Sequence, residues 1–252
     1  MLSFHITYLT LDSEDDILRE KEIFDRVSLF TISTESGAQK SKAVSLCKAS
    51  SSILLTLVIP EESKSRQEEV ELLHNPEALW TVLVVNSPRE YGLEVTIEQH
   101  CTPIAQFIRG ITSLLCTQRF NARSVYDVCM DKFRDFDDGS LFDDEHFTKS
   151  TMFHSIVKIC SELEASITSG LKFIRSIQDS DLLLLCNNAH SQEKEGIDHW
   201  FGKLKKEIFA LEDLNGQIHT LGLQAQESVS NIKPRLHGNL LIIANFINSA
   251  IL

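Results

Sequence analysis

The sequence predicts an α+β fold: a small N-terminal α/β sheet layer, then packed helices, then a long C-terminal stalk helix. Short alternating or apolar runs fill the first hundred residues, as in strands. After Pro103, apolar residues recur at three- and four-residue spacing, as in amphipathic helices. A seven-residue apolar repeat marks the last sixty residues. We therefore expect an α/β subdomain over 1–102, a helical subdomain over 103–192, and the stalk with an apolar C-terminal segment over 193–252.

Four segments of the N-terminal part are predicted to be strands. Leu2–Leu9 alternates apolar and polar residues, which is typical of a half-buried strand. Ile53–Ile59 is almost continuously apolar and ends at Pro60, and Leu79–Val85 is β-branched and apolar on both faces. Val27–Ile32 is a shorter candidate. Polar stretches compatible with helix lie between them, at Asp12–Asp25 and Glu61–Leu73.

Three segments of the second part are predicted to be helices. Ile104–Cys116 and Ala122–Phe136 carry apolar residues at helical spacing. A longer helix is expected from about Glu145 to Ile177, with a broad apolar stripe along it. Asp143 or Asp144 precedes this helix, where a carboxylate can cap the free backbone N–H groups of the first turn.

The stalk helix is predicted from apolar residues that return every seven positions over five heptads. Such a repeat forms a seam for a partner helix, either in the same chain or in another subunit. Pro234 is expected to kink the helix near its end, because proline removes a backbone donor. The residues of this seam are Ile197, Leu204, Leu211, Ile218, Ala225 and Ile232.

The apolar segment Leu240–Leu252 follows the stalk and has thirteen residues. A helix that crosses a bilayer needs about 20 apolar residues. The segment therefore predicts membrane contact without a complete crossing. A shortened membrane helix, a peripheral anchor and a helix buried in the fold are all consistent with its composition.

Composition limits the classes of function. The formal net charge of −12 and the pI of about 5.2 argue against nucleic acid as a partner, because phosphate binding depends on Lys and Arg. The six cysteines include no CxxC pair, so a zinc site or a redox motif is not predicted. With no visible secretory signal, the expected location is cytoplasmic, in contact with a membrane through residues 240–252.

The sequence contains no recognisable catalytic motif. It has no GxxxxGK[ST], GxGxxG, GxSxG or HExxH pattern, and its nine histidines are scattered. We therefore expect no enzymatic activity.

The candidate cation site is the acidic segment of residues 135–145, between two predicted helices. Hard divalent cations such as Mg²⁺ bind carboxylate oxygens that converge on one point. The spacing is not that of an EF-hand, since Gly139 would place Arg134 and Phe136 at liganding positions. A solvated helix–helix connection with an N-cap is the alternative interpretation. The candidate ligands are Asp137, Asp138, Asp143 and Asp144.

Five short motifs, in the same order, resemble the fungal branch of the CorA-like divalent-cation transporters. Ser3–Tyr8 resembles that family's SFHIPY strand, and Leu79–Val82 is similar to its RWTAY strand. Pro88–Val95 resembles PREYFLxV, and Arg235–Leu240 is similar to RLGxNV. The most specific similarity is that of Leu141–Ser150 to LFDDExFxxS.

The resemblance implies a cytoplasmic α/β domain, packed helices and a long helix that leads to a pentameric pore for Mg²⁺. In that family the pore-lining helix ends in Gly-Met-Asn, which this sequence lacks, along with a second membrane helix. The long insertion often found between the RWTAY and PREYFLxV motifs is also absent. No pore residue can therefore be carried over, and ion conduction by this chain alone is not expected.

Two hypotheses follow. In the first, the chain is a degenerate or truncated CorA-like cytoplasmic domain that self-associates through the stalk helix. In the second, it is a soluble helical interaction module that kept the fold without ion handling. Under the second hypothesis, the seam packs onto the helix of residues 145–177 within the same chain.

Overall fold

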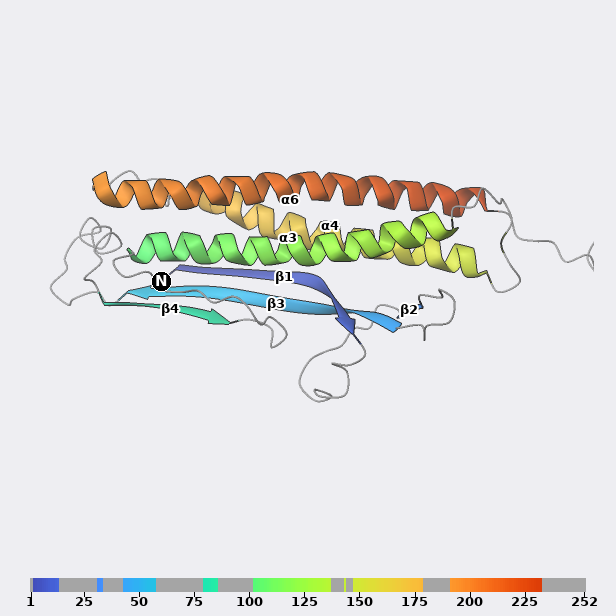
Figure 1. The fold of residues 1–252 in the computed structure, drawn as a ribbon, viewed down its shortest axis with the longest axis horizontal. Helices are drawn as coiled ribbons and strands as arrows, with labels where there is room; N and C mark the ends of the chain where they lie inside the picture. Colours follow the sequence, from blue (N-terminus) through green and yellow to red (C-terminus); the bar gives the residue numbers. More distant parts are fainter. Residues whose placement is uncertain are drawn as a thin grey trace, which may run out of the picture.

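The computed structural model describes residues 2–13, 31–33, 43–57, 79–85, 102–136, 143, 147–178 and 191–232, and they form an α+β fold in three layers. Figure 1 shows an antiparallel sheet, helices α3 and α4 above it, and α6 on the far side of those helices. The strands are β1 (Leu2–Ser13), β2 (Thr31–Ser33), β3 (Ala43–Leu57) and β4 (Trp80–Val85), and the helices are α3 (Pro103–Phe136), α4 (Thr148–Gln178) and α6 (Ser191–Asn231).

The long strand β3 is the centre of the sheet. Strand β1 pairs with it in antiparallel register from Leu2 opposite Leu55 to Ser13 opposite Val44. Strands β2 and β4 pair with opposite ends of β3 and therefore share its other edge. The prediction of strands in this part of the chain is confirmed, although β3 is much longer than the predicted segment.

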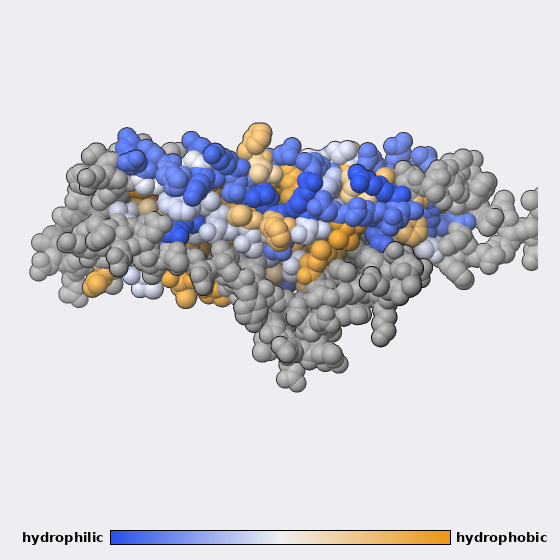
Figure 2. Space-filling model, in the orientation of Figure 1, coloured by the Kyte–Doolittle hydropathy of each residue, from blue (hydrophilic) through white to orange (hydrophobic). Residues whose placement is uncertain are grey.

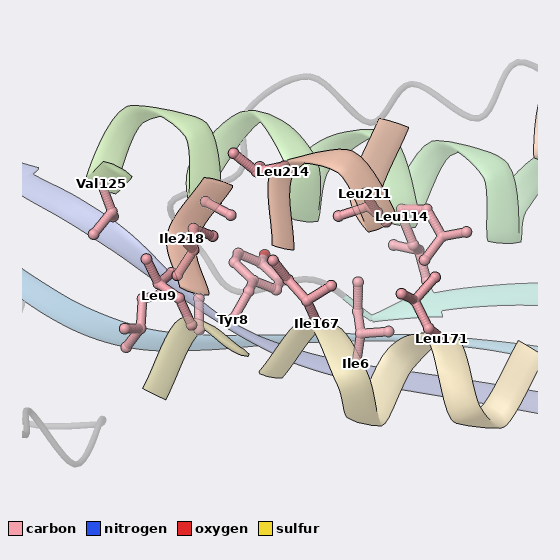
Figure 3. Packing of buried hydrophobic residues seen from close by; sticks show 14 of the residues in the cluster. Ile6, Tyr8, Leu9, Leu114, Val125, Ile167, Leu171, Leu211, Leu214 and Ile218 are labelled. Carbon is pink, nitrogen blue, oxygen red and sulfur yellow. The ribbon is translucent and has the colours of Figure 1, made fainter. Parts of the chain in front are cut away.

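Alternation along β1 directs one row of large side chains into the core. Phe4, Ile6 and Tyr8 are buried, whereas the neighbouring residues His5 and Thr7 are exposed. Tyr8 lies opposite Ala49 of β3, and its hydroxyl is 3.1 Å from Ser51 Oγ. In Figure 3 the Tyr8 ring rises from β1 into the space between the three helices, among the labelled side chains of the apolar core.

Helix α3 lies on the buried face of the sheet. It begins where the sequence predicts, because Thr102 accepts hydrogen bonds from the amides of the first turn and Pro103 follows it. A Cβ added at Gly110 would lie 1.9 Å from Ile53 Cδ1, so the glycine lets the helix approach β3 closely. The two predicted segments of residues 104–116 and 122–136 form one continuous helix of 34 residues, so the expected break is wrong.

Helix α4 runs beside the open edge of β1. Ser166 Oγ donates a hydrogen bond to the carbonyl oxygen of Thr7, and the rings of Phe4 and Phe173 pack with centroids 5.2 Å apart. The helix begins at Thr148, three residues later than expected. An unpaired strand edge is a site for unwanted pairing with another chain, so α4 also protects β1.

The three helices run up, down and up. Gln118 of α3 contacts Ser166 of α4, and Phe133 of α3 contacts Phe153 of α4, so these two helices are antiparallel. Side-chain pairs that ascend together along α3 and α6, and in opposite order along α4 and α6, show that α6 runs parallel to α3 and antiparallel to α4. The end of α3, the start of α4 and the end of α6 therefore lie at the same end of the bundle (Figure 1).

Several expectations lie outside the described residues. They are residues 14–25 of the helical stretch predicted for Asp12–Asp25, the helical stretch of residues 61–73, most of the strand of residues 27–32, the kink at Pro234, and the apolar segment of residues 240–252. The first two residues of the stretch Asp12–Asp25 belong to strand β1, so the expectation of helix is wrong for them.

Truncation of a seam residue tests the packing of α6. Leu211 is fully buried, and Leu211→Ala should lower the free energy of unfolding by about 2–5 kcal/mol, because it leaves a cavity. Gln224 lies on the same helix but is exposed, so Gln224→Ala is a control that should change it by less than about 0.5 kcal/mol. Urea denaturation followed by circular dichroism measures both. Equal effects of the two substitutions would contradict the described orientation of α6.

A second substitution tests the contact between α3 and β3. Gly110→Ala should destabilise the fold by about 1–3 kcal/mol, since the new methyl group overlaps the end of the Ile53 side chain. Ile53→Val removes the Cδ1 atom and should cost about 0.5–1.5 kcal/mol by itself. In the Ile53→Val background, Gly110→Ala should become stabilising by up to about 1 kcal/mol, because alanine favours the helix. Simple additivity in this double-mutant cycle, again by urea denaturation, would rule out the contact.

Candidate functional site

The seam of α6 is occupied by α3 and α4 of the same chain. Each of the predicted seam residues Ile197, Leu204, Leu211 and Ile218 is at most 3% exposed, and Ile232 is partly buried at the end of the described helix. Leu214 and Leu221, three residues further along each heptad, are buried as well. A second copy of the chain that binds α6 therefore has to use another face of this helix.

Gly222 interrupts the apolar row beside the seam for a packing reason. A Cβ added there would lie 3.2 Å from Cys160 Cβ of α4, a tighter approach than side chains usually make. The glycine therefore brings α4 and α6 close together.

Polar contacts hold α6 on both sides. On the α3 side, Arg119 Nε donates to Glu207 Oε2 at 2.7 Å. That hydrogen bond raises the pKa of the Arg119 guanidinium above its ordinary value, against an opposing effect of burial. Arg123 Nη1 donates to Gln217 Oε1 at 2.8 Å. With Arg109 stacked 5.2 Å from the Trp200 ring, these pairs show that the helices are parallel.

On the α4 side, the pairs run in the opposite order. Arg175 Nη2 lies 2.5 Å from Glu212 Oε1, and His219 Nδ1 lies 3.3 Å from Glu164 Oε2. Such exposed polar pairs contribute little stability each. Their positions on both flanks nevertheless fix the register of α6 in the groove between α3 and α4.

Asp143 of the acidic segment caps α4. Its Oδ1 accepts a hydrogen bond from the Lys149 amide and its Oδ2 accepts one from the Ser150 amide, both at 3.0 Å. The side chain is 2% exposed. Both carboxylate oxygens therefore serve the helix N-terminus, as the prediction of a capping carboxylate at this position expects.

The capping geometry depends on an unusual backbone conformation at Phe147. Its φ is 54°, in the left-handed region that bulky residues rarely adopt, and its carbonyl accepts the Thr151 amide at 2.9 Å. Phe147 thus occupies the N-cap position without a side chain that can cap. Asp143 supplies the missing acceptor from four residues earlier.

The described part of the acidic segment does not by itself hold a metal. Asp137, Asp138 and Asp144 lie outside the described residues, so their relation to Asp143 is open. Within the ranges that the structure describes, no three His, Cys, Asp or Glu side chains are grouped to bind a metal ion.

A buried polar chain that sequence reasoning missed links three elements. Gln118 of α3 is fully buried, and its Nε2 donates to both the carbonyl oxygen and Oγ of Ser166 at 3.2 Å. Ser166 in turn donates to the Thr7 carbonyl of β1. A Cβ added at Gly170 would lie 3.1 Å from Gln118 Oε1, so the glycine makes room for the amide.

A small open cavity of about 220 Å³ lies beside this chain, between β1 and α4. Lys48 and Glu162 form an ion pair across 3.0 Å at its wall, and His5, Ser166 and Ser169 also line it. Small-molecule sites usually measure about 300–1,000 Å³. Lys48 and Glu162 already bind each other, so a small polar ligand would have to compete with this ion pair for its charged groups.

Two buried cysteines lie where α3, α4 and α6 meet. Burial raises the pKa of the Cys160 thiol to about 12, with a further contribution from the charge of Glu164. Burial also raises the pKa of Cys129, with a smaller contribution from Cys160. Both thiols stay protonated at neutral pH, and a thiol has to lose its proton to act as a nucleophile or metal ligand.

None of the helices in the described ranges combines the length and apolar character that a membrane crossing requires. Comparison of the chain with protein-family models, curated proteins and solved structures found no match.

Substitutions at the cap test the link between Asp143 and Phe147. Asp143→Ala should lower the free energy of unfolding by about 1–2 kcal/mol, because two amides of α4 lose their acceptor. Phe147→Gly should raise it by about 1 kcal/mol, because glycine adopts the left-handed conformation without strain. Thermal and urea denaturation measure both effects. The control Asp131→Ala, at an exposed carboxylate of α3, should change stability by less than about 0.5 kcal/mol.

Proposed function

We propose that this chain is a non-enzymatic CorA-like domain, of the type that lies on the cytoplasmic side of a magnesium transporter. In this proposal it is a degenerate or truncated form that does not conduct ions by itself. The ordered motifs support the family assignment. The sequence of structural elements, with a sheet first and a long helix last, is the architecture that this resemblance implies.

The observation that carries the proposal is the position of Asp143, the one candidate cation ligand among the described residues. Asp143 lies at the start of α4, at the end of the bundle where α6 finishes at Asn231. The chain continues from there toward the apolar segment of residues 240–252. A cation bound by the acidic segment would thus act near the point where the chain leaves the bundle for a membrane.

The shape of α6 also supports this function. A helix of 41 residues is about 60 Å long, and α3 and α4 hold it along one side. A braced helix of that length is a stiff connection between a folded domain and a distant membrane surface. In this proposal residues 240–252 contact the lipid, and the domain stands in the cytoplasm.

Magnesium titration tests the proposal. At about ten times its dissociation constant, Mg²⁺ should add about 1.4 kcal/mol to the free energy of unfolding. For a chain of this size, that raises Tm by roughly 3–6 °C. The variant Asp138→Asn/Asp144→Asn should lose the response, because it removes two carboxylates from the acidic segment. Differential scanning calorimetry with MgCl₂, and with NaCl at equal ionic strength, measures both.

A matched control separates a cation site from general screening of the acidic surface. Glu195→Gln/Asp198→Asn makes the same change of net charge at two exposed positions at the other end of the bundle. This variant should keep the full magnesium response. An equal response in all three proteins would mean that the ion only screens charge, and no response in the wild type would remove the cation-sensing function.

A second candidate is the helical interaction module without ion handling. Two observations favour it: the α6 seam is satisfied within the chain, and the carboxylate of Asp143 is committed to capping α4. It predicts no specific effect of Mg²⁺ on Tm. The same titration therefore separates the two candidates.

A further inference from the structure

The outer face of α6 carries a second heptad stripe, opposite the buried seam. Gly202, Phe209, Gly216 and Leu223 follow one another at seven-residue intervals. Phe209 is 74% exposed and Leu223 is 59% exposed, which is unusual for large apolar side chains on a helix whose other side forms the core. Figure 2 shows the surface over α6 as mainly hydrophilic with separate hydrophobic side chains. Along the stripe, two large apolar residues alternate with two glycines, so apolar projections alternate with notches.

The two notch glycines have no packing reason among the residues that the structure describes. A Cβ added at Gly202 or Gly216 would meet none of these residues within 4 Å, in contrast to Gly222, where α4 lies close. Glycine in the middle of a helix is destabilising relative to alanine. A helix surface therefore keeps two unfavourable residues beside two exposed apolar residues, as expected where another backbone approaches closely.

We propose that this stripe, Gly202–Phe209–Gly216–Leu223, binds the same stripe of a second copy of the chain in an antiparallel pair. A two-fold axis between Glu212 and Asp213 places each Phe209 over Gly216 of the second copy. The same axis places each Leu223 over Gly202. Every projection then meets a notch, which is the self-complementarity that a two-fold interface requires.

The position of that axis brings nearly the whole helix into contact. Glu212 and Asp213 lie close to the middle of α6, which extends from Ser191 to Asn231. A helix about 60 Å long and about 10 Å wide presents a footprint of roughly 600 Å². Two such footprints bury about 1,200 Å², which is at the lower limit for a specific interface.

Charge selects the antiparallel orientation. The side chains that flank the stripe include Lys205, Lys206 and Glu212. A parallel pair in register would place each of them beside its own copy, and it would also place Phe209 against Phe209 and Gly216 against Gly216. In the antiparallel pair, only Glu212 and Asp213 near the axis meet their own copies, and Glu212 is already bound by Arg175.

The pair goes beyond the proposed function and does not rest on it. Its two α6 helices end at opposite ends of the dimer, and the pairing uses only residues of α6. The pair is measured without lipid or Mg²⁺, so its failure leaves the cation test intact.

Sedimentation equilibrium of the full chain and of four variants tests the pair. Gly216→Phe should weaken dimerisation at least about tenfold, because Phe209 then meets a filled notch. Phe209→Gly should weaken it as well, because the projection is gone. The combined variant Phe209→Gly/Gly216→Phe exchanges projection and notch, and it should restore the dimer to within about threefold of the wild type. Gly196→Phe, at a glycine with open space but about 100° from the stripe, should leave the dimer unchanged.

The outcomes separate association from folding. Gly216→Phe replaces an exposed helix glycine, so it should not lower Tm while it weakens the dimer. A wild-type chain that is monomeric at tens-of-micromolar concentration overturns the proposal, as does a dimer that ignores Gly216→Phe. A dimer that is weakened by both single substitutions but not restored by the exchange overturns the antiparallel alignment.

Discussion

The groove between α3 and α4, filled by the apolar seam of α6, is the constraint on which the rest of the structure depends. A helix of 41 residues with charged and exposed residues along most of its surface gains little stability in isolation. Its seam residues, centred on Leu211 and Ile218, are buried because two antiparallel helices present apolar rows at a matching interval. The sheet in turn supports those two helices, since β1 contributes Phe4, Ile6 and Tyr8 to the same core.

Polar groups then fix an arrangement that apolar packing alone would leave free to slide. Apolar side chains at heptad spacing tolerate a shift by one repeat, whereas hydrogen bonds do not. Gln118 and Ser166 join α3, α4 and β1 at one level of the bundle, and Arg119 with Glu207 sets the level of α6. Buried amides that have few partners are costly to misplace, so the correct register is favoured over its neighbours.

Periodicity in the sequence was enough to predict the layers, the start of α3 and the α6 seam, because each follows from local patterns. The prediction of two helices within residues 103–136 was wrong because burial there does not follow residue polarity. The polar Gln118 is buried, whereas the apolar Phe120 is 69% exposed. The first half of β3 was missed for a related reason. Small residues such as Ala49 and Ser51 lie beside Tyr8 of β1. The sequence of this part of β3 therefore lacks the alternation of large apolar and polar residues by which a strand is recognised. The partner of Gln118 lies 48 residues away, and no local pattern reports a contact at that separation.

Of the candidate cation ligands, only Asp143 can be assigned a role from the structure. It caps helix α4, so a carboxylate in a sequence that resembles a metal site stabilises the fold. A cluster of aspartates in sequence predicts a cation site and a helix cap equally well, because both need carboxylate oxygens. The left-handed conformation of Phe147 decides the matter for Asp143, since it turns the chain so that this carboxylate reaches the Lys149 and Ser150 amides.

The polar contacts are unevenly distributed along α6, and this bears on both candidate functions. Its cross-helix polar contacts extend from Trp200 to His219 among the described residues, whereas Leu221 and Ala225 beyond them contribute apolar burial. Apolar contacts are less directional than ion pairs and hydrogen bonds. The last three turns of α6 are therefore the part that can adjust at the least cost, and they lie at the same end of the bundle as Asp143. A partner or ion acting at that end would change the direction in which the chain leaves the bundle before it disturbed the core around Tyr8.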